Sequence, residues 1–266
     1  MHIINNLEGF GLVDGNEIIG NVSKFVNSKI IFKGKGNVIY VDGNITISDS
    51  NIVFHGNDSL LYLSESKTPY LINISIYNKS VVYFGGDTYF NKILTVIASE
   101  AKNVIIGSDS LFSYGIVIRN SDAHLIFDII SNERINFSKS VYIGDGVWIG
   151  QNCTILKGNV VGSGSIIGSD SVLSNKKVSS HSIWAGNPAK EVKKGVVWDG
   201  TCVHSWMSED SEQNKKCRNA RLFKPDDDTI DINVFEKNIN SFVKPADKLN
   251  FIRSFFINKR NRMFIQ

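Results

Sequence analysis

Branched apolar residues recur every six positions between residues 140 and 174, and this period constrains the fold more than any other feature. They are Ile143, Ile149, Ile155, Val161, Ile167 and Leu173. A helix repeats every 3.6 residues and a strand every two, so neither element alone gives a period of six. One short strand and one corner do take six residues, and three such units close a triangular coil. The hexads therefore predict a parallel β-helix in which each of these residues stacks on its equivalent one coil further along.

Glycine follows four of the six stacked positions, at Gly144, Gly150, Gly162 and Gly168. Glycine adopts backbone angles that a β-carbon opposes, and tight corners often require such angles. We therefore expect these four glycines to supply the conformational freedom of the corners.

A longer repeat of 22 residues precedes the hexads. Its equivalent positions form three sets: Ile30, Ile52, Ile74 and Val96; Val38, Leu60, Val82 and Val104; and Tyr40, Tyr62, Phe84 and Ile106. We interpret these segments as wider coils of the same prism, with longer corners. The prism is then expected over residues 28–198, and residues 1–27 are expected to form an irregular cap. A cap is needed because an open coil edge leaves backbone groups unpaired.

Residues 121–140 interrupt both repeats. Ile118 and Ile143 are 25 positions apart, which is not a multiple of six. We therefore expect a loop to be extruded from the prism here, with His124 at its base. Loops held by a rigid scaffold often bind or catalyse, although a single histidine in such a segment also fits a structural role.

The chain changes character after Trp198, and residues 199–266 are expected to form a partly helical extension. A polar, irregular stretch comes first. Apolar residues then recur at helical spacing, at Leu249, Ile252, Phe255 and Phe256. With Pro245 before them and Asp247 as the expected N-cap, they predict one or two short amphipathic helices packed on the prism or on a neighbouring subunit. The tail is basic at Lys259, Arg260 and Arg262, which fits a solvated terminus or contact with an anionic polymer.

Composition excludes several functions. The net charge is +3 with both signs interspersed, so nucleic-acid binding is not expected. No window reaches 18 uninterrupted apolar residues, so no membrane-spanning helix is expected, and the first 15 residues lack the pattern of a signal peptide. The three cysteines, Cys153, Cys202 and Cys217, show no metal-ligand spacing. They predict a reduced, cytoplasmic protein without a metal.

The hexads, with SDAHLIFD before them and IWAGNPAK after them, resemble the hexapeptide acetyltransferases. The likeness is greatest to the branch that O-acetylates sugars of capsular and other surface polysaccharides, and it covers about residues 96–198. Trp148 follows His124 by 24 residues, as in that branch, whereas Ala123 stands where glycine is common. The resemblance implies an all-β, left-handed parallel β-helix. It also implies a homotrimer, acetyl-CoA as donor, a saccharide acceptor and active sites between neighbouring subunits.

The resemblance also implies roles for individual residues. His124 would be the general base that takes the proton of a sugar hydroxyl, because a neutral imidazole titrates near pH ~6.5. Asp122 would bind acceptor hydroxyls or orient the imidazole, or would be a solvated turn residue. Trp148 would contact both the donor and the acceptor, with a trimer-interface aromatic as the alternative, and Tyr114 is a further candidate for the acceptor.

The donor would need contacts for its pantetheine arm, its phosphates and its adenine. By the same resemblance, Gln151, Ser169 and Ser174 would contact the arm, and Pro188 would pack near the adenine. The phosphates would meet four lysines, Lys176, Lys177, Lys190 and Lys193, although a run of lysines is also typical of a solvated face.

Two other functions stay open at this point. An N-acetyltransferase acting on an amino sugar, a nucleotide sugar or an antibiotic would use the same base and differ only in its acceptor. A β-helix can also serve as a binding scaffold without turnover. A carbonic anhydrase on this fold would need three histidine ligands, two of them close in sequence, and the five histidines contain no such pair.

Overall fold

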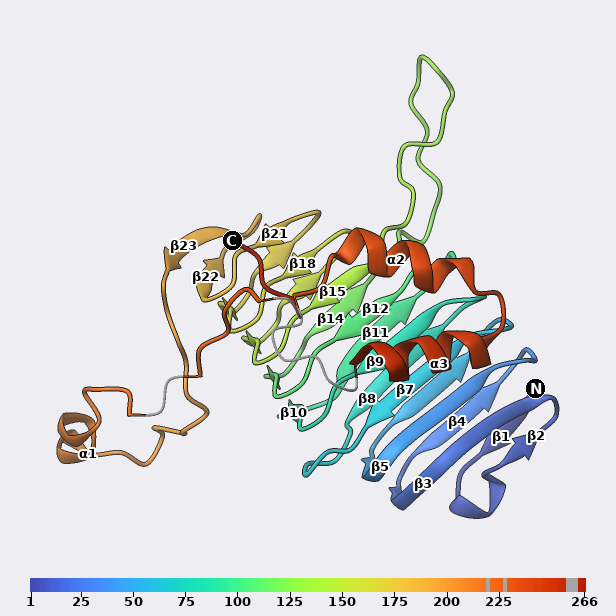
Figure 1. The fold of residues 1–266 in the computed structure, drawn as a ribbon, viewed down its shortest axis with the longest axis horizontal. Coiled ribbons are helices and arrows are strands. Elements are labelled where there is room, and N and C mark those ends of the chain that lie inside the picture. The colour runs from blue at the N-terminus through green and yellow to red at the C-terminus, as the bar shows by residue number, and fades with distance from the viewer. Residues whose placement is uncertain (219–220, 227–228, 257–262) are drawn as a thin grey trace.

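The chain folds into a three-sided prism. The computed structural model describes residues 1–218, 221–226, 229–256 and 263–266, and the figures draw the other residues in grey. Within the described residues three sheets form the faces of a left-handed parallel β-helix (Figure 1). The predicted fold class is confirmed.

We name the faces A, B and C after the order in which the chain visits them. Face A contains β1 (His2–Ile4), β4 (Lys29–Phe32), β6 (Asn51–Phe54), β8 (Ile72–Ile76), β11 (Leu94–Ala98), β14 (Val117–Arg119), β17 (Thr154–Ile155) and β20 (Val172–Leu173). Face B contains β2 (Leu12–Val13), β3 (Asn16–Val26), β5 (Val38–Ser48), β7 (Leu60–Ser64), β9 (Val81–Phe84), β12 (Val104–Ile106), β15 (Val141–Ile143), β18 (Val160–Val161) and β21 (Lys177–Val178). Face C contains β10 (Tyr89–Phe90), β13 (Leu111–Phe112), β16 (Trp148–Ile149), β19 (Ile166–Ile167), β22 (Ser182–Ala185) and β23 (Lys190–Lys194).

The stacking predicted from the hexads is confirmed in register. The strand pairs place Ile143 beside Val161, Ile149 beside Ile167 and Ile155 beside Leu173. All six side chains are fully buried. Each coil therefore adds one layer to a continuous apolar column.

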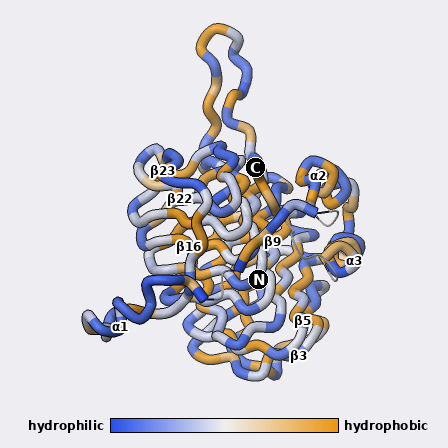
Figure 2. Tube along the Cα trace, turned by 60° about the vertical axis from the view of Figure 1, so that its left-hand side comes forward, coloured by the Kyte–Doolittle hydropathy of each residue, from blue (hydrophilic) through white to orange (hydrophobic). Residues whose placement is uncertain are grey.

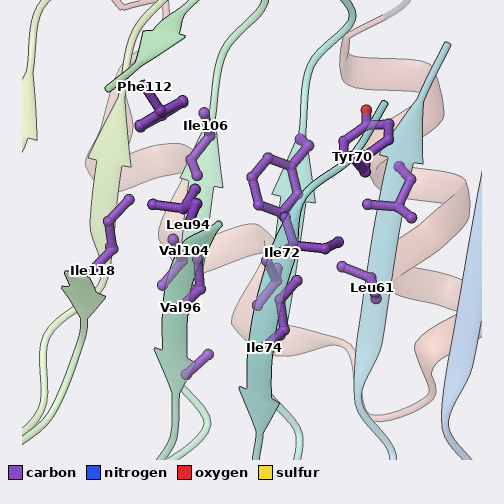
Figure 3. Packing of buried hydrophobic residues seen from close by; sticks show 14 of the residues in the cluster. Leu61, Tyr70, Ile72, Ile74, Leu94, Val96, Val104, Ile106, Phe112 and Ile118 are labelled. Atoms are coloured by element: carbon purple, nitrogen blue, oxygen red, sulfur yellow. The ribbon is translucent and has the colours of Figure 1, made fainter. Parts of the chain in front are cut away.

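The 22-residue repeat is confirmed on face A and wrong at one step on face B. Ile74 pairs with Val96, which in turn pairs with Ile118, and these side chains lie in one row of the core (Figure 3). On face B, however, Tyr62 pairs with Tyr83 rather than with Phe84. The corner before β9 is one residue shorter than its equivalents, so Phe84 turns into the core, where it is fully buried.

The reason expected for the glycines is wrong. Gly144, Gly150 and Gly162 lie outside the left-handed region, and a β-carbon on them would come within 2.6, 2.7 and 2.6 Å of a backbone nitrogen in the next coil. Close approach of neighbouring coils therefore excludes a side chain there. The left-handed corner residues come three positions after the first five stacked residues, at Gly146 (φ 60), Asn152 (φ 55), Gly158 (φ 75), Gly164 (φ 74) and Asp170 (φ 58).

Two C-terminal helices cover the outer side of face B. After η1 (Leu7–Gly9) and α1 (Ser208–Gln213), the chain forms α2 (Ile232–Ser241) and α3 (Pro245–Phe256). Phe256 stacks on Tyr83 with ring centroids 4.5 Å apart, and Phe235 meets Tyr142 edge to face. The amphipathic helices predicted from the sequence are confirmed, but Asp247 lies inside the first turn of α3 and is not its N-cap.

The N-terminal segment contributes to the prism as well as covering it. Strand β3, within the residues expected to form a cap, pairs in parallel with β5. Strand β1 runs antiparallel to β4. The basic residues Lys259, Arg260 and Arg262 lie outside the described residues. No helix in the described chain is long and apolar enough to cross a membrane.

A glycine substitution tests the close approach of neighbouring coils. Replacing Gly144 by Ala should lower the free energy of unfolding by about 1–3 kcal/mol, because the new β-carbon overpacks the corner against Ser163. Urea unfolding measures the change. In the control Gly200→Ala, the new β-carbon would lie 3.8 Å from its nearest neighbour, a ring atom of Trp198, and the free energy of unfolding should not change. Equal stability of both variants would contradict the packing role of Gly144.

Candidate active site

A long loop leaves the prism between β14 and β15, at the corner between faces A and B. It stands clear of the body in two views (Figures 1 and 2). The two halves of the loop are held together by backbone hydrogen bonds, from Ile135 N to Ile126 O at 3.0 Å and from Asp128 N to Glu133 O at 2.9 Å. Residues 121–140 therefore form an antiparallel arm carried by a rigid scaffold.

The arm is apolar and exposed. Seven large apolar side chains along it are at least half exposed, and Ile129 and Ile130 at the tip are 91% and 88% exposed. The other five are Leu125, Ile126, Phe127, Ile135 and Phe137. A contiguous exposed apolar surface of this kind is typical of a protein interface.

Asn136 and Lys157 fix the base of the arm, where His124 is located. Asn136 Nδ2 donates to the carbonyl oxygen of His124 at 2.7 Å and to Asp122 Oδ2 at 3.0 Å. Lys157 Nζ forms an ion pair with Asp122 and donates to the carbonyl oxygen of Asn136 at 3.0 Å. The imidazole of His124 is exposed, at a position set by its own backbone contacts.

These contacts give Asp122 a structural role. The hydrogen bond from Lys157 holds the pKa of the Asp122 carboxyl below its ordinary value, with help from Asn136. The carboxylate is thus tied to the next coil, and no contact between it and the imidazole of His124 is present in the described chain. Sequence reasoning missed Lys157, although it is the one cation at its hexad position. The equivalent residues of four other hexads are Asp145, Gln151, Ser163 and Ser169.

A second set of hydrogen bonds holds the C-terminal half of the arm. Arg134 Nη2 donates to both carboxylate oxygens of Glu100, at 2.8 and 3.0 Å, and Ser138 Oγ donates to the same carboxylate at 2.6 Å. Both strands of the arm are therefore anchored to the prism by charged hydrogen bonds.

Trp148 lies on the outer side of face C. It pairs with Leu111 on one side and with Ile166 on the other, and its side chain is 38% exposed. The ring centroid of Trp198 lies 6.0 Å away, and Trp198 Nε1 donates to the carbonyl oxygen of Gly146 at 2.7 Å. Sequence reasoning missed this tryptophan pair, because nothing local links residues 50 positions apart.

His124 and Trp148 are not brought together within one chain. The arm leaves at the corner between faces A and B, and that corner is opposite face C in a three-sided prism. A single subunit therefore presents the two residues in different directions.

The remaining predicted residues are distributed over two corners and two edge strands. Tyr114, Gln151 and Ser169 occupy successive coils at the corner between faces C and A, linked by hydrogen bonds from Asn152 N to Tyr114 O and from Asp170 N to Gln151 O, both 2.8 Å. Pro188 is exposed at the same corner, in the following coil. Two residues before it, the carbonyl oxygen of Gly186 accepts a hydrogen bond from Val172 N. The other five residues lie elsewhere: Ser174 and Lys176 at the corner of the arm, Lys177 on β21, and Lys190 and Lys193 on the exposed strand β23.

Metal ligands are not grouped in the described residues. No set of three or more histidine, cysteine, aspartate or glutamate side chains is placed there to hold an ion. All three cysteines are free thiols.

Known proteins similar to the chain agree with this architecture. The family model for the bacterial transferase hexapeptide (six repeats) matches residues 140–175. A polysialic acid O-acetyltransferase of Neisseria meningitidis is 34% identical over 182 residues, which is 68% of this chain and 84% of that protein. This chain belongs to the hexapeptide-repeat O-acetyltransferases. The resemblance inferred from the sequence is confirmed, and the protein is an acyltransferase by family.

Two solved members of this family share the fold. The polysialic-acid-specific acetyltransferase NeuO superposes with a TM-score of 0.61 at 31% identity, covering 75% of this chain and 96% of that one. The polysialic acid O-acetyltransferase OatWY gives 0.58 at 29% identity, covering 75% and 95%. A polysialic acid O-acetyltransferase of Escherichia coli O1:K1 / APEC is 40% identical over 121 residues, 46% of this chain and 38% of that protein.

Removing the partner of Asp122 tests how the arm is anchored. In Lys157→Met the pKa of Asp122 should rise toward the usual ~3.9, because the charged hydrogen bond is lost. The pKa of Asp122 is lower in the folded protein than in the unfolded chain. The ion pair therefore stabilises the arm fully when the pH is above the unfolded-state pKa, and this stabilisation is lost as the pH falls through the folded-state pKa. Carboxyl ¹³C shifts of labelled aspartate, recorded against pH, measure the change.

The matched control is Lys139→Met, because Lys139 bonds to Asn175 at 3.0 Å rather than to Asp122. An Asp122 titration that stays the same in Lys157→Met would show that Lys157 does not govern this carboxyl.

Proposed function

We propose that this protein transfers acetyl from acetyl-CoA to a hydroxyl of an acidic, sialic-acid-containing capsular polysaccharide. The observation that carries the proposal is the pairing of an anchored, histidine-bearing arm with an exposed tryptophan on the opposite face. Two family members, whose structures match 75% of this chain, are named as a polySia-specific acetyltransferase and a polysialic acid O-acetyltransferase, which supports this acceptor.

His124 is the proposed general base. Its neutral imidazole accepts the proton of the acceptor hydroxyl while that oxygen attacks the thioester carbonyl. As the carbon–sulfur bond breaks, the leaving sulfur takes the proton from the imidazolium, so His124 ends the cycle neutral. Asn136 and the anchors on Asp122 and Glu100 hold the backbone at His124, which limits where the imidazole can reach.

The active sites are proposed to form between subunits of a homotrimer. The arm directs His124 away from its own Trp148, so a cyclic assembly that places the arm of one subunit along face C of the next would unite them. The exposed apolar side chains of the arm support this arrangement, since their burial would stabilise the contact.

The donor fits the residues at face C and its corner with face A. Trp148 offers an apolar surface, Gln151 and Ser169 offer polar groups, and Pro188 lies at the same corner. Exposed Lys190 and Lys193 would meet phosphate groups. Ser174, Lys176 and Lys177 lie near the arm, so in the trimer they would reach the donor from the subunit that supplies His124. Acetyl-CoA supplies the activated acyl group.

Transfer to an amino group is the alternative reaction. It would use the same base, and only the acceptor separates the two, so the assay includes polysialic acid, sialic acid and amino sugars side by side. A binding scaffold without turnover would show no acetyl transfer to any of them. We propose a cytoplasmic location, supported by the free thiols of Cys153, Cys202 and Cys217.

Replacing the base tests the mechanism. His124→Ala should lower kcat on polysialic acid by about 10²–10⁴-fold, the usual contribution of a general base. Acetyl-CoA binding and the mass of the assembly should be unchanged, because His124 contacts neither its own face C nor the core. The control is His204→Ala, an exposed histidine in the C-terminal extension, which should keep wild-type activity. Full activity of His124→Ala would overturn the assignment.

A further inference from the structure

A groove of about 870 Å³ runs along the N-terminal coils, away from the arm. It follows the corner that precedes face A, and its walls come from the starts of β4 and β6 and from the segments before β8 and β11. We propose that this groove is an accessory binding site for an acidic polysaccharide. The inference deepens the proposed function and rests on it for the identity of the glycan.

The charge of the groove favours an anionic ligand. Lys29 and Lys92 are exposed on its walls, and neither forms an ion pair within the described part of the chain. Asp49 is the acidic residue of the lining, and its carboxylate accepts a hydrogen bond from Asn27 Nδ2 at 2.6 Å. Two free ammonium groups beside one partly satisfied carboxylate leave a net positive surface suited to the carboxylates of a glycan.

The other groups of the lining match a sugar chain. Amide side chains carry donors and acceptors together, which suits hydroxyl and N-acetyl groups. Asn27 and Asn91 are exposed in the lining, whereas Asn51 Oδ1 is buried and Asn51 Nδ2 donates to Asn73 Oδ1 at 3.4 Å. Leu71 and Ile93 add an apolar surface, with Ile93 44% exposed, against which the CH faces of a sugar ring can pack.

The groove runs toward Tyr114, the further candidate for contact with the acceptor. Thr95 on β11 pairs with Val117 on β14, and two residues before them stand Ile93 and Gly115. Ile93 closes one end of the groove, and Gly115 directly follows Tyr114. Ile93 and Gly115 therefore belong to neighbouring coils, whose paired strands are about 4.8 Å apart. A polymer that reaches Tyr114 can continue along the groove, whereas a single sugar cannot occupy both.

Direct binding tests the groove without any acetyl transfer. Fluorescently labelled polysialic acid, titrated with the intact protein in the absence of acetyl-CoA, should bind the double variant Lys29→Glu/Lys92→Glu at least about tenfold more weakly than the wild type, and the difference should shrink in high salt. The control is Lys24→Glu/Lys33→Glu, which reverses two exposed charges of the same coils outside the groove. A labelled neutral dextran should bind no variant measurably.

Kinetics separate this inference from the proposed function. The KM for polysialic acid should be about tenfold higher in the groove variant than in the wild type, at similar kcat. The KM for a single sialic acid should be the same in both proteins. Equal binding and equal KM in an active enzyme would overturn the groove while leaving the proposed function intact. Weakened binding in a protein that acetylates no glycan would support the groove and overturn the proposed function. A changed mass of the variant assembly would assign the groove to a subunit interface and overturn the inference.

Discussion

Stacking of equivalent side chains between successive coils is the interaction on which the rest of the structure depends. Each coil buries one apolar residue per face against the coil before it, as Val161 does against Ile143. The backbones come so close at the corners that Gly144 and Gly150 leave no room for a β-carbon. Because the column tolerates neither insertion nor misregister, extra chain must leave the prism at a corner. The arm of residues 121–140 is such an insertion.

That constraint also explains why His124 and Trp148, the two main candidate residues, point apart. A prism corner cannot face the opposite side of the same prism, so the residue carried by the arm and the residue on face C point apart. The arm is held to its corner by Lys157 and Glu100, and face C is held by the core. Two rigid half-sites are more consistent with a site assembled between subunits than with closure of one chain on itself.

The sequence allowed the fold to be predicted because its signal is periodic. The hexads define the stacked residues, and the 22-residue repeat identifies the wider coils on face A. A one-residue shortening before β9 was not visible, since Tyr83 and Phe84 are both aromatic and either fits the pattern. The corner glycines were assigned a wrong cause, because the sequence does not distinguish positive φ from close approach.

Candidate site residues could be named from the sequence only where they coincide with a family pattern. His124 and Trp148 stand out by their spacing, but the ties of Asp122 to Lys157 and of Trp148 to Trp198 join distant segments without a local signal. The groove near Lys29 is likewise assembled from five stretches of chain, so its charge balance emerges only after folding.

Subunit mixing tests the shared active site most directly. Two variants that should each lose activity, His124→Ala and Trp148→Ala, would be co-expressed in equal amounts, and the specific activity of the mixed assembly compared with that of each variant alone. If the site is shared between neighbours, about a quarter of the interfaces will contain one intact histidine and one intact tryptophan, and activity will return to about a quarter of the wild-type value. If each chain carries its own site, no interface is repaired, and an inactive mixture would contradict the account.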